Sequence, residues 1–213
     1  MSRDALHPFI ERLRQRLAGR LPGESAQYLM APPRRGRPDH ALSMKVPQRE
    51  GAVLLYLFPQ RGHWHTVLMK RPAYPGVHGG QVSIPGGRLE PGEDHRQAAL
   101  REFAEETGVR VVSRQLIGGL SELFIPASHF RVRPYVAYAM QRPCFAPDPI
   151  EVEEIIELMI PSLMSDSTLR RGIVCLSSGE SVEAPYFDVD GHRVWGATAM
   201  ILSELKEILR GMT

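Results

Sequence analysis

Three glutamates with the spacing of a metal-binding helix face are the residues most suited to chemistry. Glu102, Glu105 and Glu106 fall in a stretch, residues 95–107, whose alanine content favours a helix, and Gly108 follows where a glycine commonly ends one. At 100° per residue the three carboxylates occupy one arc of roughly 100°. Such carboxylates repel one another unless a cation lies among them, and Mg²⁺ or Mn²⁺ prefers oxygen ligands.

The rest of this helix should position the carboxylates. We expect its opposite side to pack against a sheet through Leu100, Phe103, Ala104 and Thr107. Arg101 lies four residues before Glu105 and can pair with it, or with Glu93 across the preceding loop. Because exposed ion pairs contribute about 0–1 kcal/mol, such a pair should orient the acidic residues more than it stabilises the fold. A merely solvated acidic face is the alternative.

A glycine-rich turn comes directly before the helix, at residues 84–88. Its adjacent glycines, Gly86 and Gly87, allow positive φ angles and let the backbone approach a phosphate or a metal closely. Taken alone, Pro-Gly-Gly is usually no more than a turn. Its place immediately before the acidic helix makes it part of the candidate site and disfavours the solvated-face alternative.

The turn and the helix together form a longer pattern. The run 87–109 fits the template G-x5-E-x7-R-E-apolar-x-E-E-x-G-apolar at Gly87, Glu93, Arg101, Glu102, Phe103, Glu105, Glu106, Gly108 and Val109. Chance would produce its seven fixed residues in about one chain of this length in a million. The chain therefore resembles the Nudix hydrolases, which cleave nucleoside diphosphates linked to another group. The resemblance implies an α/β fold, an α/β/α sandwich with a mixed β-sheet.

The same resemblance implies a role for each site residue. Mg²⁺ or Mn²⁺ would be the cofactor, with Glu102, Glu106 and the backbone carbonyl of Gly86 as metal ligands. Glu105 would bind a metal or polarise the attacking water. Glu93 and Arg101 would orient this catalytic set.

The run 87–109 is called the Nudix box below. Residues upstream of this box indicate which substrate the resemblance favours. The stretch 68–87 is similar to the motif that precedes the box in coenzyme A pyrophosphatases, with agreement at Leu68, Arg71, Gly80, Gln81, Val82, Ser83, Pro85, Gly86 and Gly87. Met69, Pro72, Gly76 and Ile84 depart from it. The similarity implies cleavage of coenzyme A to 3′,5′-ADP and 4′-phosphopantetheine. Arg71 and Gln81 are candidates to contact the phosphates, with a structural hydrogen-bonding role as the alternative for each. Glu151 and Glu154 are candidates for a further acidic group from a loop.

Other functions stay open at this point. The chain could hydrolyse another nucleoside diphosphate derivative, such as ADP-ribose, a dinucleotide or a nucleoside triphosphate, or it could trim the 5′ end of RNA. A nucleotide-binding regulatory module without catalysis is the non-enzyme alternative. Such modules usually lose a glutamate of the box, whereas all four are present here.

Charge and composition suggest the organisation of the chain. Residues 1–38 hold eight arginines against three acidic residues, so we expect a helix and a basic, Pro/Arg-rich linker at 1–40, and the Nudix hydrolase domain at 41–213. A solvated flexible arm is the simpler interpretation of the basic segment, and one that attracts a polyanion is the alternative. Nucleic acid is not expected as a partner; the sequence leaves a homodimer open.

The chain lacks the features of a membrane or secreted protein. No apolar run approaches the ~20 residues that span a bilayer, and the first residues do not form a signal peptide. Cys144 and Cys175 are expected to be reduced, packed thiols of a cytoplasmic protein.

Periodicity predicts the framework. We expect helices at 5–16 and 198–209, and strands at 52–58, 66–70, 131–140 and 155–160, with a hairpin at 186–195. Strand material at 111–124 should be broken by Gly118 and Gly119.

Overall fold

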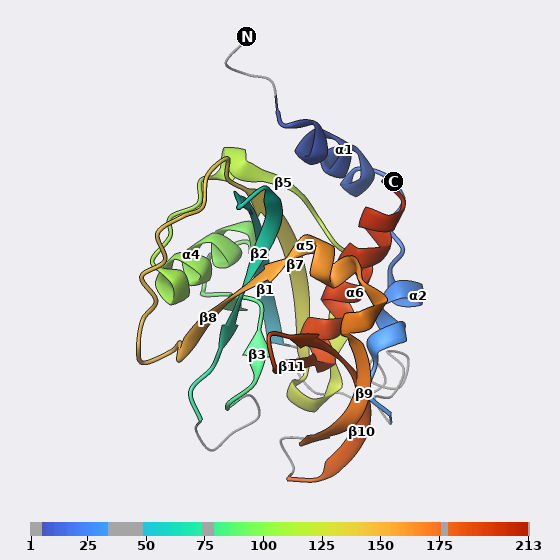
Figure 1. Ribbon diagram of the computed structural model, residues 1–213. Coiled ribbons are helices and arrows are strands. Elements are labelled where there is room, and N and C mark those ends of the chain that lie inside the picture. Colours follow the sequence, from blue (N-terminus) through green and yellow to red (C-terminus); the bar gives the residue numbers. More distant parts are fainter. Residues whose placement is uncertain (1–5, 34–48, 74–78, 176–178, 213) are drawn as a thin grey trace.

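The computed structural model describes residues 6–33, 49–73, 79–175 and 179–212. A central β-sheet lies between helix α4 on one face and helices α1 and α6 on the other (Figure 1). A small second sheet lies beside it, close to α6. The architecture is the α/β/α sandwich with a mixed sheet that the sequence predicts.

The central sheet has eight strands, of which five form the path β3-β2-β1-β7-β5. Strand β4 pairs with β1, β6 with β7 and β8 with β2. Only the β1–β7 pair is parallel among the pairings of the described strands. The strands are β1 (Arg49–Gln60), β2 (His63–Lys70), β3 (Val82–Ser83), β4 (Gly86–Arg88), β5 (Leu116–Gly119), β6 (Leu123–Ile125), β7 (Phe130–Tyr138) and β8 (Glu154–Met159).

The second sheet has the order β11-β10-β9, and helices complete the fold. Its strands are β9 (Leu169–Cys175), β10 (Ser181–Val189) and β11 (His192–Trp195). The α-helices are α1 (Pro8–Leu17), α2 (Glu24–Gln27), α4 (His95–Thr107), α5 (Ile160–Met164) and α6 (Gly196–Arg210). Short 3₁₀ turns are η1 (Tyr28–Met30), η2 (Ser113–Gln115), η3 (Pro126–Ser128) and η4 (Asp166–Thr168). None of the described helices is long and apolar enough to span a membrane.

Strand β1 divides the apolar core into two parts. Its alternate residues point to opposite faces, so Leu55 and Leu57 join the core beneath α1 and α6, whereas Leu54 and Phe58 join the core beneath α4. Burial on both faces explains why the sequence there is a continuous apolar run, and the strand predicted at 52–58 is confirmed.

The N-terminal segment packs against the body of the protein instead of forming a solvated arm. Ile10, Leu13 and Leu17 of α1 are buried in the same core as α6. A Cβ atom on Gly118 would lie 2.7 Å from the Cβ of Leu17, so only glycine lets α1 come this close to β5. The expectation of an arm is therefore wrong for residues 6–33. The proposed boundary near residue 40 lies outside the described residues.

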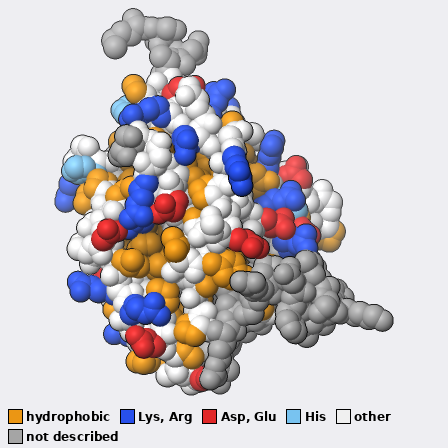
Figure 2. Space-filling model, turned by 90° about the vertical axis from the view of Figure 1, so that its right-hand side faces the viewer, with side chains coloured by type: hydrophobic (Ala, Val, Ile, Leu, Met, Phe, Trp, Pro, Cys, Tyr) orange, Lys and Arg blue, Asp and Glu red, His pale blue; other side chains and the backbone are white. Residues whose placement is uncertain are grey.

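The described Lys and Arg side chains do not gather into a single patch on the face in view. Figure 2 shows the side of the molecule that carries α1, α2 and α6, where Lys and Arg side chains are interleaved with acidic and apolar ones. Two other expectations need correction. Gly118 and Gly119 are the last residues of β5, at a shift in its register with β7, so the break in strand material comes directly after them, at residues 120–122. Cys144 and Cys175 are free thiols as expected, but they are exposed, not packed.

A buried carboxylate fastens the N-terminal segment to α6. Glu204 has no exposed surface, and it accepts hydrogen bonds from the backbone N of Gly23 at 3.0 Å, the side chain of Gln27 at 2.9 Å and the backbone N of Ser121 at 3.2 Å. Three chain segments far apart in the sequence thus meet at one side chain. Donors left unpaired in such a place are costly, because each loses its hydration without replacement.

Replacing Glu204 with leucine should therefore lower the free energy of unfolding by about 3 kcal/mol or more, since several buried donors would lose their acceptor. Urea denaturation measures the loss. Glu207→Leu is the matched control, because Glu207 pairs with Arg210 at the surface and its removal should cost about 0–1 kcal/mol. Equal losses in the two variants would show that Glu204 does not hold the segments together.

Candidate active site

Helix α4 has the bounds that the sequence predicts, and both of its ends are capped. The side chain of Asp94 accepts hydrogen bonds from the backbone N of Arg96 and of Gln97, and the side chain of Gln97 accepts one from the backbone N of Asp94, which completes a capping box. At the other end Gly108 is left-handed, with φ of 72°.

The buried face of α4 is rotated from the one expected. Phe103 and Thr107 are buried as predicted, and Phe103 packs against Tyr56 of β1 at a ring separation of 5.1 Å. Leu100 and Ala104 are only half-buried, however, and Glu106 is buried. The three glutamates thus lie in very different environments, because the arc that they share runs from the buried side of the helix to the exposed side.

The two glycines of the turn let β4 pass beneath the helix. Gly86 has φ of 147°, and a Cβ atom on it would collide with the backbone of Ala52 in β1. A Cβ atom on Gly87 would collide with the carboxylate of Glu102. A larger residue at position 86 would therefore separate β4 from β1, and one at position 87 would displace Glu102. The tight packing of the backbone that these glycines allow is present, and their approach to a phosphate or a metal stays a prediction.

Glu106 is the most constrained of the acidic residues, with 1% of its surface exposed. One carboxylate oxygen accepts a hydrogen bond from the backbone N of Gly86 at 2.7 Å, and the other accepts one from Nη2 of Arg71 at 2.9 Å. Burial raises the pKa of Glu106 to about 7, against the opposing effect of the Arg71 charge. The backbone turn, the helix and strand β2 therefore converge at this carboxylate.

Arg101 connects the loop between β4 and α4, called the box loop below, to the exposed side of α4. Its guanidinium donates two hydrogen bonds of 2.9 Å to the carboxylate of Glu93 and one of 2.9 Å to Glu105, and it lies 3.1 Å from an oxygen of Glu102. It also donates to the backbone O of Arg88. The pKa of Glu93 is lowered by Arg101, whereas burial raises the pKa of Glu102. The sequence left open whether Arg101 pairs with Glu93 or with Glu105, and it pairs with both.

The remaining candidate residues are Gln81, Glu151 and Glu154. Gln81 accepts a hydrogen bond from the backbone N of Arg71 through its own backbone O, at 3.0 Å. Glu154 lies 3.4 Å from His192, but Glu151 is close enough for its charge to raise the pKa of Glu102 and of Glu106. Glu154 is the first residue of β8 and not a loop residue, so the expectation of a loop is wrong for it, whereas Glu151 acts on the box carboxylates by its charge. Within the ranges that the structure describes, no cluster of three or more His, Cys, Asp or Glu side chains is ready to hold a metal.

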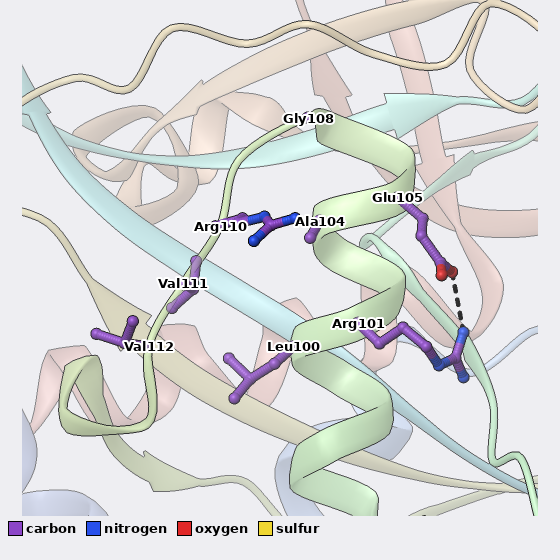
Figure 3. Close-up of a pocket in the computed structure, with 8 residues that line it drawn as sticks. All are labelled: Leu100, Arg101, Ala104, Glu105, Gly108, Arg110, Val111 and Val112. Carbon is purple, nitrogen blue, oxygen red and sulfur yellow. Dashed lines mark hydrogen bonds and ion pairs between the residues drawn. The ribbon is translucent and has the colours of Figure 1, made fainter.

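A groove of about 510 Å³ lies on the outer side of α4, lined by Leu100, Arg101, Ala104, Glu105, Gly108, Arg110, Val111 and Val112 (Figure 3). The figure shows Arg101 and Glu105 paired on one side of the helix and Arg110 directed toward Ala104 on another. Neither Gly86 nor Glu106 lines this groove. The groove is thus a separate feature from the convergence at Glu106.

The raised pKa of Glu106 has a consequence for stability. In the folded protein the carboxyl group of Glu106 keeps its proton up to about pH 7, compared with an ordinary pKa of 4.5. Its stabilising contribution to the folded state is therefore fully present below about pH 4.5 and is lost as the pH rises through about 7. Without divalent ions this loss should be on the order of 3 kcal/mol. Urea denaturation between pH 4.5 and 8 in a chelator should show a smaller fall for Glu106→Gln than for the unaltered protein.

The control for this experiment is Glu105→Gln, whose carboxylate is mostly exposed, and it should follow the unaltered protein across the range. Parallel curves for the unaltered protein and Glu106→Gln would contradict the account of Glu106.

Comparison with known proteins gives the family. Residues 48–159 match the family model described as the NUDIX domain. Nudix hydrolase 3 of Caenorhabditis elegans is 30% identical over 173 residues, which cover 74% of this chain and 72% of that protein. The mitochondrial coenzyme A diphosphatase NUDT8 of Mus musculus is 31% identical over 129 residues, 59% of this chain and 61% of that one.

Among solved structures, a MutT/nudix family protein from Enterococcus faecalis superposes with a TM-score of 0.53 at 16% identity, covering 97% of this chain and 76% of the other. This likeness shows the fold. The family model, the relatives and the complete box agree with one another, and the chain belongs to the Nudix hydrolases.

Proposed function

We propose that the protein is a metal-dependent pyrophosphohydrolase that cleaves the diphosphate bond of coenzyme A, releasing 3′,5′-ADP and 4′-phosphopantetheine. The observation that carries the proposal is the convergence of Gly86, Arg71 and the buried carboxylate of Glu106, with Glu102 against Gly87. This arrangement combines acidic oxygens with a cationic group that suits a phosphate.

The possible metal-ligand atoms that meet here suit a hard divalent cation. They are all oxygens: the carboxylate of Glu106, the backbone carbonyl of Gly86 and the half-buried carboxylate of Glu102. A carboxylate as buried as that of Glu106 also needs a positive partner. A bound Mg²⁺ or Mn²⁺ would neutralise charge on the phosphate oxygens and acidify the attacking water.

Other residues around the proposed metal site have separate roles. Glu93 and Arg101 keep Glu102 and Glu105 in place through the contacts described above. Glu151 follows Asp148, whose backbone O accepts hydrogen bonds from the N of Glu151 and of Val152, so the turn is ordered. Glu105 remains the residue proposed to bind a metal or polarise the attacking water, and Glu151 is proposed as a further acidic group of the site, because its charge raises the pKa of Glu102 and of Glu106.

Coenzyme A is favoured over other nucleoside diphosphate derivatives by the upstream motif. The strands that carry it lie side by side, since β2 pairs with β3, and the hydroxyl of Thr198 at the start of α6 donates to the backbone O of Val82 at 3.1 Å. The start of α6 is thus joined to the segment that precedes the box. The mouse relative named a coenzyme A diphosphatase supports the same substrate. Arg71 and Gln81 are the proposed contacts to the phosphates of coenzyme A. The cytoplasmic location of the protein stays a prediction.

Liquid chromatography of the products tests the substrate. Incubated with coenzyme A, ADP-ribose, NADH and ATP in turn, each with Mg²⁺ or Mn²⁺, the protein should release 3′,5′-ADP from coenzyme A well above any turnover of the others. Preferred turnover of ADP-ribose or NADH would overturn the coenzyme A assignment while leaving the hydrolase.

Glu106→Gln tests the metal site in the same assay. It should lower turnover by about a hundredfold or more, since a neutral amide is a poor ligand for a hard cation. Glu157→Gln is a matched control, because Glu157 pairs with Arg142 away from the box, and it should keep its activity. A fully active Glu106→Gln would contradict the proposed site.

A further inference from the structure

Arg71 occupies the place where a cation would contact both Glu106 and Gly86. A single nitrogen of its guanidinium, Nη2, lies 2.9 Å from an oxygen of Glu106 and 3.4 Å from the backbone O of Gly86. These are two of the oxygens that the proposed function assigns to the divalent ion. The positive charge that now balances the buried carboxylate therefore comes from the chain itself.

The backbone of Arg71 is held on both sides, so only its side chain is free to move. Its own N donates to the backbone O of Gln81 at 3.0 Å. The preceding residue, Lys70, accepts at its backbone O from the N of Glu153 at 2.9 Å, and its side chain pairs with the same glutamate. The side chain of Arg71 is 23% exposed, so it can reach the surface by rotation about its own bonds.

An ion and this guanidinium would compete for the same oxygens. Mg²⁺ needs oxygen ligands at about 2.0–2.1 Å, and two cations that close together repel strongly where water is excluded. Glu106 has little freedom to serve both, because its second oxygen already accepts from the backbone N of Gly86 at 2.7 Å. Glu106 is also too buried for water to replace the lost partner.

We propose that Arg71 is an exchangeable counter-ion: it balances Glu106 in the absence of a divalent ion, is displaced when the ion binds, and then turns to the diphosphate of the substrate. Arg71 is thus the partner of Glu106 before the ion binds and a contact for the substrate afterwards. The planar guanidinium suits both partners, because it forms paired hydrogen bonds with carboxylates and with phosphates alike. The inference rests on the proposed function for the identity of the ion and of the diphosphate.

The exchange makes opposite predictions for two ligands. Arg71→Met should bind Mn²⁺ about fivefold more tightly than the unaltered protein, because the ion no longer has to displace a guanidinium. Once saturated with Mn²⁺, the same variant should bind ADP, used here as a probe diphosphate, about fivefold more weakly. Calorimetric titration above pH 8 measures both affinities. Weaker or unchanged Mn²⁺ binding in Arg71→Met would overturn the proposal.

A matched control is Arg142→Met, which removes another arginine paired with a glutamate, Glu157, outside the box. Both affinities should stay unchanged in it. Arg71→Lys keeps the charge but not the planar group, and its Mn²⁺ affinity should remain close to that of the unaltered protein. A loss of structure in Arg71→Met could only weaken both ligands together, so the opposite signs separate exchange from a structural role.

A measurement on the unaltered protein guards against a variant that does not fold. The Nε–H resonance of Arg71, assigned by comparison with Arg71→Lys, should shift on addition of Mg²⁺ and exchange faster with water. A resonance that Mg²⁺ leaves in place would contradict displacement. These readouts need no turnover, so they separate a failure of the exchange from a failure of the coenzyme A assignment.

Discussion

The structure of the site depends on one buried carboxylate, that of Glu106. A charge with almost no exposed surface must be paired, and here the backbone amide of Gly86 and the guanidinium of Arg71 supply the partners. Each partner restricts the chain that carries it. Strand β4 must pass directly beneath α4, which only glycine permits at 86 and 87, and β2 must end where Arg71 can reach the helix. Helix, turn and strand are therefore placed relative to one another by their common contact with this side chain.

Two other polar side chains join separate segments of the fold. Arg101 joins the box loop to the exposed side of α4, and its pairing with Glu93 and Glu105 orients carboxylates more than it stabilises the fold. On the far side of the sheet, Glu204 holds the N-terminal segment against α6 through backbone and amide donors. The acidic residues thus differ in role: Glu204 satisfies buried donors of its own chain, whereas the box glutamates are the proposed ligands of a cation.

Several elements of the fold and of the candidate site could be predicted from the sequence, because they depend on neighbouring residues in the chain. The bounds of α4, its left-handed Gly108 and the doubly buried strand β1 all reflect periodicity and glycine chemistry that act over a few residues. The burial of Glu106 could not, since a helical wheel places three glutamates on one arc without locating the strand that covers one end of it. The close packing of α1 onto β5 was missed for the same reason: the contact of Leu17 with Gly118 joins residues a hundred positions apart, and Gly118 alone suggests a break in a strand.

The central claim is that the oxygens of Glu106 and Gly86 receive a divalent ion in exchange for Arg71. A crystal structure of the protein soaked in Mn²⁺, with the ion located by its anomalous scattering, tests this most directly. The account predicts a peak in contact with the carboxylate of Glu106 and the carbonyl of Gly86, and an Arg71 side chain turned away from both. Manganese bound elsewhere, with Arg71 still hydrogen-bonded to Glu106, would contradict it.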